Sequence, residues 1–167
     1  PYEKNGYFYY TRYEEGKEYP IYCRKKNSLD NNEEILLDVN IMADGYDYFH
    51  VNGLSVSPDN KMMAYGVDTI SRRMYTIKIK NLETGEILND VMNITTGYAV
   101  WANDNKTLFY TKKDEETLRS NQIFKHKLGD DATADLKVYE EADETFNASV
   151  WKTKSEKYII IGSYSTM

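Results

Sequence analysis

The chain has one cysteine, Cys23, and two histidines, His50 and His126, among its 167 residues. A single cysteine cannot form a disulfide within the chain, and these three residues lie too far apart in sequence to form a zinc signature. Cys23 lies in a strand-like segment, so we expect a packed thiol, with a reactive thiol as the alternative. No apolar run approaches the roughly 18 residues that span a bilayer, and the first residues show no signal-peptide pattern.

Motifs that carry catalysis or bind nucleotides are also missing. The nearest string to a G-x-S-x-G nucleophile elbow, residues 162–166, has Thr166 where the second glycine is needed. A Ser–His–Asp triad needs a histidine held by an acid, whereas His50 and His126 both lie in strand-like segments and are expected to be packed or solvent-facing. No glycine-rich phosphate loop occurs. We therefore expect no catalytic, cofactor-binding or metal-binding residues in this chain.

Positive charge is in the minority. The chain has 21 Lys and Arg against 27 Asp and Glu, a formal net charge of −6. This balance argues against nucleic acid or an anionic membrane as a partner, because both favour a basic face. The densest acidic run, residues 140–144, is expected to be a solvated loop. The alternative is a metal site made by Glu140, Glu141 and Asp143, although nothing in their spacing fixes one.

Tyrosine is abundant, at 16 of 167 residues. Tyrosine has a high β-propensity, and its ring suits positions that are buried with a polar tip. The aromatic segment 7–10 could stack on single-stranded nucleic acid, but the acidic balance favours sheet packing instead.

A phrase made of a strand, a tight turn and a second strand recurs along the chain. In its clearest copy Pro58 fixes the backbone of the turn, and Asp59 and Asn60 supply local hydrogen bonds. Complete or partial copies occupy residues 5–10, 54–68, 100–110 and 150–160. A strand-rich repeat of about 45–55 residues is typical of a β-propeller.

The repeat predicts an all-β fold, a partial β-propeller of about three and a half four-stranded antiparallel blades. The pieces fall at roughly 1–40, 41–95, 96–140 and 141–167, with the opening strand missing from the first and two strands missing from the last. One helical turn is expected at 40–45, closed by Gly45. Apolar and polar alternation predicts strands at 6–11, 20–25, 34–38, 53–57, 62–68, 74–81, 88–93, 98–101, 107–112, 122–127, 136–139, 148–151 and 158–163.

Two predicted hairpin loops place an acid before arginine. Asp68 precedes Arg72 and Arg73, and Asp114 precedes Arg119. We interpret the first arrangement as a carboxylate–guanidinium pin for the hairpin, with a ligand site as the alternative. Either way, an exposed pair of this kind contributes only about 0–1 kcal/mol.

The chain begins with Pro1 and stops after an apolar strand, so we expect a piece of a longer protein. Cut sheet edges expose unpaired backbone groups, and they favour self-association of the isolated piece.

Several segments together resemble the oligopeptidase B group of the prolyl oligopeptidase family of serine peptidases. The resemblance runs from about residue 7 to about residue 166 and is carried by residues 9–26, 34–40, 56–59, 68–76, 81–85, 122–129 and 138–141. It implies a cytoplasmic parent in which a seven-bladed propeller caps an α/β-hydrolase domain. The catalytic triad and the pocket for basic side chains would lie in that domain, beyond Met167.

The resemblance implies that the parent cleaves short peptides after Arg or Lys, and that the propeller gates the active site and excludes large substrates. We expect the chain alone to be inactive, and acidic residues Glu14, Glu15, Asp114 and Glu115 to attract basic peptides. The alternative is a binding or scaffold propeller attached to no enzyme. A lectin-like carbohydrate- or metal-binding domain has no motif to support it.

Overall fold

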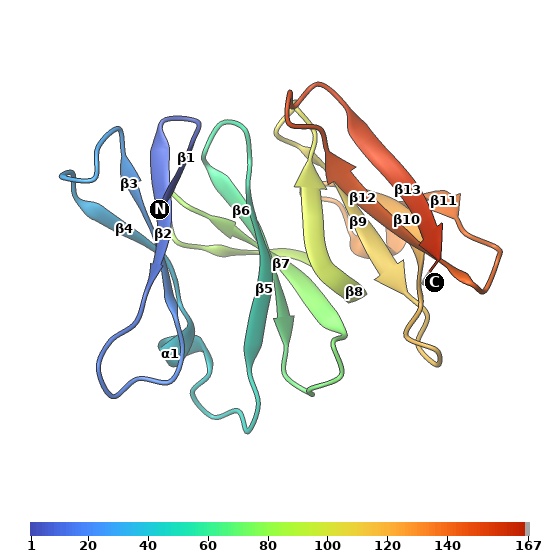
Figure 1. Ribbon diagram of the computed structural model, residues 1–167, viewed down its shortest axis with the longest axis horizontal. Helices are drawn as coiled ribbons and strands as arrows, with labels where there is room; N and C mark the ends of the chain where they lie inside the picture. The colour runs from blue at the N-terminus through green and yellow to red at the C-terminus, as the bar shows by residue number, and fades with distance from the viewer. Residues whose placement is uncertain (166–167) are drawn as a thin grey trace. The chain divides into compact units, whose positions relative to one another are not determined.

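The computed structural model describes residues 1–165 as antiparallel β-sheet with little helix (Figure 1). The chain divides into two compact units, Pro1–Tyr48 and Phe49–Met167, and each is described here by itself. In the described part of the chain, no helix is both long enough and apolar enough to cross a membrane.

The first unit is one four-stranded meander. Its strands are β1 (Tyr2–Lys4), β2 (Tyr7–Arg12), β3 (Ile21–Lys26) and β4 (Glu33–Asp38), and they pair in that order. The helical turn α1 (Val39–Met42) follows, and the Asp38 side chain caps it by accepting the N–H of Asn40. The prediction that the first repeat lacks its opening strand is wrong. Tyr2 to Lys4 supply a short one, which its three exposed residues do not mark as a strand.

The second unit contains a seven-stranded antiparallel sheet in which each strand pairs with the next along the chain. Its strands are β5 (His50–Val56), β6 (Met62–Asp68), β7 (Tyr75–Asn81), β8 (Ile87–Trp101), β9 (Thr107–Lys113), β10 (Ser120–Lys127) and β11 (Leu136–Glu140). A 3-10 turn, η1 (Ala132–Ala134), precedes β11. The strands β12 (Phe146–Lys152) and β13 (Ile159–Ser165) form a separate hairpin.

Strand β8 belongs to two meanders. The sequence predicts separate strands at 88–93 and 98–101, but the structure has one strand of 15 residues. Its first part pairs with β7, its second part pairs with β9, and Thr95 pairs with both Tyr75 and Lys112. Positive φ values at Ile94 and Gly97 bend the backbone without ending the strand.

The bend in β8 brings three glycines into close contact. A Cβ atom on Gly53 would lie 2.0 Å from the Gly97 carbonyl oxygen, and one on Gly66 would lie 2.5 Å from the Gly97 Cα. The Thr95 hydroxyl fixes the bend, because it donates to the Tyr75 carbonyl and accepts from the Gly97 N–H. Beside this crossing lies the apolar core, made of Ala64, Ile77, Ile79, Met92, Ala99, Trp101, Leu108 and Tyr110.

The recurring phrase forms the same turn in its last three copies. One residue of each copy has a left-handed backbone, with φ of 64° at Asn60, 59° at Asn105 and 58° at Glu156. In these three turns a backbone hydrogen bond also closes the base, as from the Ala102 N–H to the Thr107 carbonyl at 2.8 Å. Asn5, with φ of 48°, holds the corresponding position in the first unit.

Candidate functional site

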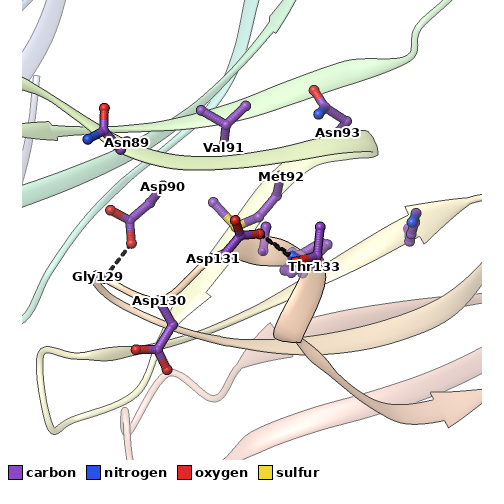
Figure 2. A pocket seen from close by; sticks show the side chains of 12 residues that line it. Asn89, Asp90, Val91, Met92, Asn93, Gly129, Asp130, Asp131 and Thr133 are labelled. Carbon is purple, nitrogen blue, oxygen red and sulfur yellow. Dashed lines mark hydrogen bonds between the residues drawn. The ribbon is translucent and has the colours of Figure 1, made fainter.

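A pocket of about 560 Å³ lies in the second unit, between the first part of β8 and the loop that precedes β11 (Figure 2). One wall is the β8 segment 89–93, and the other is the segment 129–133. Tyr110 and Lys112 of β9 complete the lining. Figure 2 shows Asp90 directed toward Gly129, which donates its backbone N–H to that carboxylate at 2.6 Å.

A buried histidine contacts Asp90 of this pocket. His126 of β10 is fully buried, and its two ring nitrogens contact two different carboxylates. Its Nε2 lies 2.8 Å from an Asp90 oxygen, and its Nδ1 lies 2.7 Å from an Asp135 oxygen. The two carboxylate side chains are only 5% and 3% exposed. His126 is therefore held between two acids, which the sequence interpretation did not anticipate.

Tyr110 extends this cluster. Its hydroxyl donates to the second oxygen of Asp135 at 2.8 Å. Burial, and then this hydrogen bond, raise the pKa of Tyr110 well above its ordinary range. The phenol therefore stays protonated and acts as a fixed donor.

A signal for the cluster was present in the strand periodicity. On β8, Asp90 falls in phase with the buried Met92, between the exposed Asn89 and Val91. On β10, His126 is buried between two exposed lysines. A strict period-two assignment puts both polar side chains inside, but no sequence rule shows that two separate strands bring them together.

The loop after Asp68 is pinned, but not by guanidinium groups. The buried Asp68 carboxylate accepts the backbone N–H groups of Ile70 and Arg73, at 2.9 and 2.8 Å. Within residues 1–165 the side chains of Arg72 and Arg73 form no ion pair. The predicted carboxylate–guanidinium pin is wrong, because the nearer backbone donors already satisfy the acid.

The equivalent loop of the next meander uses its acid and its arginine separately. Asp114 accepts the backbone N–H groups of Thr117 and Glu116, which lower its pKa. Arg119 instead donates to three main-chain carbonyls in the connection between β11 and β12. These acceptors are Asp143 and Phe146, both at 2.8 Å, and Glu141 at 3.2 Å.

The acidic run is occupied by local hydrogen bonds. Glu140 contacts Gln122 and Lys137, while Glu141 accepts from Tyr139, from Ser163 and from the Asp143 N–H. Asp143 caps the following turn through Thr145. In the described residues no group of three or more His, Cys, Asp or Glu side chains is placed to hold a metal ion.

The other residues considered from the sequence are dispersed. The Nδ1 of His50 lies 2.9 Å from the Tyr75 hydroxyl. Cys23 is buried, and burial raises the pKa of its thiol to about 11. Of the string at 162–166, Ser163 contacts Glu141, whereas Thr166 lies outside the described residues.

The acidic residues expected to attract peptides lie on two hairpin loops. Glu14 and Glu15 follow β2, and Asp114 and Glu115 follow β9. Glu14 forms an ion pair with Arg12 at 2.7 Å. Glu15 and Glu115 are exposed.

The chain forms three antiparallel sheets in succession, and within each sheet every strand pairs with the next along the chain, as is typical of β-propeller blades. The sequence matches the family described as prolyl oligopeptidase, N-terminal β-propeller domain, over residues 1–167. The chain therefore belongs to this family of peptidase propeller domains. The predicted fold class and the predicted family are both confirmed.

Named relatives agree with this assignment. Dipeptidyl aminopeptidase BI of Pseudoxanthomonas mexicana is 40% identical over 182 residues, which cover 100% of this chain and 25% of that protein. Protease 2 of Moraxella lacunata is 37% identical over 172 residues, and the match covers 99% of this chain and 25% of that protein. Oligopeptidase B from Leishmania major superposes with a TM-score of 0.92 at 34% identity, and the match covers 98% of this chain and 23% of that protein. The chain thus spans about a quarter of the length of the proteins it matches.

Proposed function

We propose that this propeller segment caps the active site of a serine oligopeptidase that cleaves short peptides after Arg or Lys. The catalytic partner would be an α/β-hydrolase domain of the same parent chain, and the parent would be cytoplasmic. The observation that carries the proposal is the match of the whole chain to the propeller domain, with a TM-score of 0.92 to an oligopeptidase B.

In this proposal the propeller acts by excluding large substrates, not by chemistry. Its blades would be residues 1–40, 41–95, 96–140 and the incomplete 141–167, as the repeat predicts. A ring of such blades would admit a short extended peptide and block a folded protein. The expected result for the parent is efficient cleavage of short peptides and none of folded proteins.

We propose that the chain by itself has no peptidase activity. Its two histidines support this, because both already have other partners. His126 lies between Asp90 and Asp135, and His50 contacts the Tyr75 hydroxyl. A serine or cysteine nucleophile needs a histidine or a comparable base within hydrogen-bond reach.

Acidic loop residues could also favour basic peptides. Glu14 and Asp114 are unsuitable probes of this idea, since Arg12 engages one and loop N–H groups engage the other. Glu15 and Glu115 are exposed and make the better pair. The double change to Gln in the parent should lower kcat/KM for an Arg-containing peptide and weaken its salt dependence. Unchanged values in both would exclude the electrostatic role.

The main test compares substrates of the full-length protein. One fluorogenic peptide carries Arg before the scissile bond, and its matched control carries citrulline, which has nearly the same shape but no charge. We expect strong preference for Arg and no turnover of either peptide by residues 1–167 alone. Equal rates for the two peptides would overturn the specificity, and turnover by residues 1–167 would overturn the inactivity. A parent without a downstream G-x-S-x-G-G motif would instead support a scaffold propeller.

A second candidate activity comes from the relative that is 40% identical, which is named a dipeptidyl aminopeptidase. Release of dipeptides needs a free substrate N-terminus, whereas internal cleavage does not. The same Arg peptide with a free and with a blocked N-terminus separates the two activities. Loss of turnover on blocking would favour dipeptide release over the proposed oligopeptidase activity.

A further inference from the structure

The cluster of Asp90, His126 and Asp135 contains more hydrogen-bond contacts than a neutral imidazole can supply. Each ring nitrogen of His126 faces a carboxylate oxygen, at 2.8 and 2.7 Å. An ionised carboxylate only accepts, and a neutral imidazole has a single N–H. Two short N···O contacts therefore require one additional proton, located on the ring or on one of the acids.

Among residues 1–165, the other groups that bond to the two carboxylates do not remove this requirement. The Asp90 oxygen also accepts the Gly129 N–H at 2.6 Å, and the second Asp135 oxygen accepts the Tyr110 hydroxyl at 2.8 Å. Both are donors, so neither offers an acceptor for the additional proton, which must lie in the contacts with His126. Without that proton, one buried nitrogen lone pair would face a buried carboxylate oxygen, and that contact would become repulsive.

The contacts fasten separate segments of the second unit to one another. Asp90 lies on the first part of β8, His126 is the penultimate residue of β10, and Asp135 directly follows η1. The first part of β8 and the loop that leads to Asp135 form the two walls of the pocket in Figure 2. If the contacts on both sides of His126 broke, this cluster would hold the 129–135 loop only through the Gly129–Asp90 and Tyr110–Asp135 hydrogen bonds, so the pocket wall would be more weakly fastened to β8.

We propose that Asp90, His126 and Asp135 form a proton-dependent latch that fastens the 129–135 loop to β8 and opens as the pH rises. In the open state water reaches all three side chains, so the cluster no longer requires the additional proton. The closed state keeps that proton, so opening releases it. Linkage then makes the opening equilibrium constant rise about tenfold per pH unit while the closed state stays protonated.

The test is hydrogen exchange of the full-length protein, followed by mass spectrometry at pH values from 6 to 9 and corrected for the intrinsic chemical rate. Opening of peptides that cover 126–136 and 87–95 should increase with pH across this range, by up to about tenfold per pH unit. Peptides from β3, in the other unit, report any general loosening. A wild-type protein whose 126–136 peptides show no rise beyond that of β3 overturns the proposal, whatever any variant does.

Asp135→Asn is the decisive variant. An asparagine there can accept from Tyr110 and donate to the unprotonated Nδ1, while Nε2–H still donates to Asp90. All contacts are then satisfied without the additional proton, so the pH dependence should vanish. Asp131→Asn is the matched control, because Asp131 caps Thr133 and has no contact with His126. A slope that survives in Asp135→Asn, or is lost equally in Asp131→Asn, would also refute the latch.

Discussion

The side-chain oxygen of Asn105 accepts the backbone N–H of Asp59, at 2.9 Å. These residues belong to two copies of the same turn, in successive repeats of the second unit. Asn103 makes the corresponding link onward, because its amide donates to the Glu156 carbonyl in the next copy. The recurring phrase thus marks the period in the sequence and also supplies the hydrogen bonds between its copies.

Substitution of Asn105 should separate this link from the backbone strain of the turn. Asn105→Gly keeps the left-handed conformation and removes the acceptor, so we expect a loss of about 0.5–1.5 kcal/mol in the free energy of unfolding. Asn105→Ala should cost about 1–2 kcal/mol more, because alanine is disfavoured at this φ. Urea titrations followed by fluorescence of the buried Trp101 measure both. Equal stability of the two variants would contradict the strain.

Arg119 should hold the connection into β12. Because the charged Arg119 side chain donates to three carbonyls, Arg119→Ala should lower the free energy of unfolding by about 2–3 kcal/mol. It should also speed hydrogen exchange in β12. Arg119→Lys should recover only part of this free energy, because an ammonium group cannot reproduce the planar, forked donors of the guanidinium. Arg72→Ala is the control on the equivalent loop, since its exposed side chain has no partner within residues 1–165. A control as destabilised as Arg119→Ala would contradict the assignment.

The period-two pattern and the repeat length predict most of the strands because both depend on local sequence. The pattern fails at β1, whose three residues are exposed, so burial cannot mark them. It also fails at β8, where Thr95 and Gly97 look like a connection between strands. There the strand continues because the Thr95 hydroxyl bonds to Tyr75 and Gly97 across the bend.

The polar sites are harder to predict, because their partners come from distant segments or from the backbone. His126 lies 36 residues from Asp90 in sequence, and only the fold brings them together. Asp68 was correctly expected to pin its loop, but its donors are backbone N–H groups that every sequence carries. Sequence therefore locates such a polar residue on a strand or loop and leaves its partner undetermined.

The close contact of Gly53 and Gly66 with Gly97 leaves no room for an added methyl group. A Cβ on Gly66 would lie 2.5 Å from one backbone atom of Gly97 and 2.8 Å from another, so neither can move cheaply. We expect Gly66→Ala to lower the free energy of unfolding by about 3 kcal/mol or more. Gly85→Ala is the matched control, with φ of +79° and nothing within 4 Å, and it should lose only about 1–2 kcal/mol. Equal urea midpoints would show that the sheet can adapt at Gly66.

Cys23 should be unreactive in the folded protein. It is 1% exposed, and burial raises the pKa of its thiol to about 11, so almost no thiolate is present at neutral pH. A pulse of iodoacetamide at pH 7.5, followed by peptide mapping, should label Cys23 only after denaturant is added. Rapid labelling of the native protein would show that the first unit opens, or that the thiol is accessible.

The ion pair between Arg12 and Glu33 should make the first unit sensitive to acid. Arg12 donates to both Glu33 oxygens at 3.1–3.2 Å, and Tyr10 donates to one at 2.7 Å. The Arg12 hydrogen bonds, and then that from Tyr10, lower the pKa of Glu33 in the folded state. A carboxyl with a lowered pKa stabilises the fold fully above its unfolded value of about 4.3, and this contribution is lost as the pH falls through the folded value.

Glu33→Gln should therefore weaken hydrogen-exchange protection of β3 and β4 at pH 7, and the difference from wild type should shrink below about pH 4.3. Glu3→Gln, on the exposed strand β1, should leave that protection unchanged at every pH. A difference between wild type and Glu33→Gln that stays constant down to pH 3 would mean that the carboxylate charge does not stabilise this sheet.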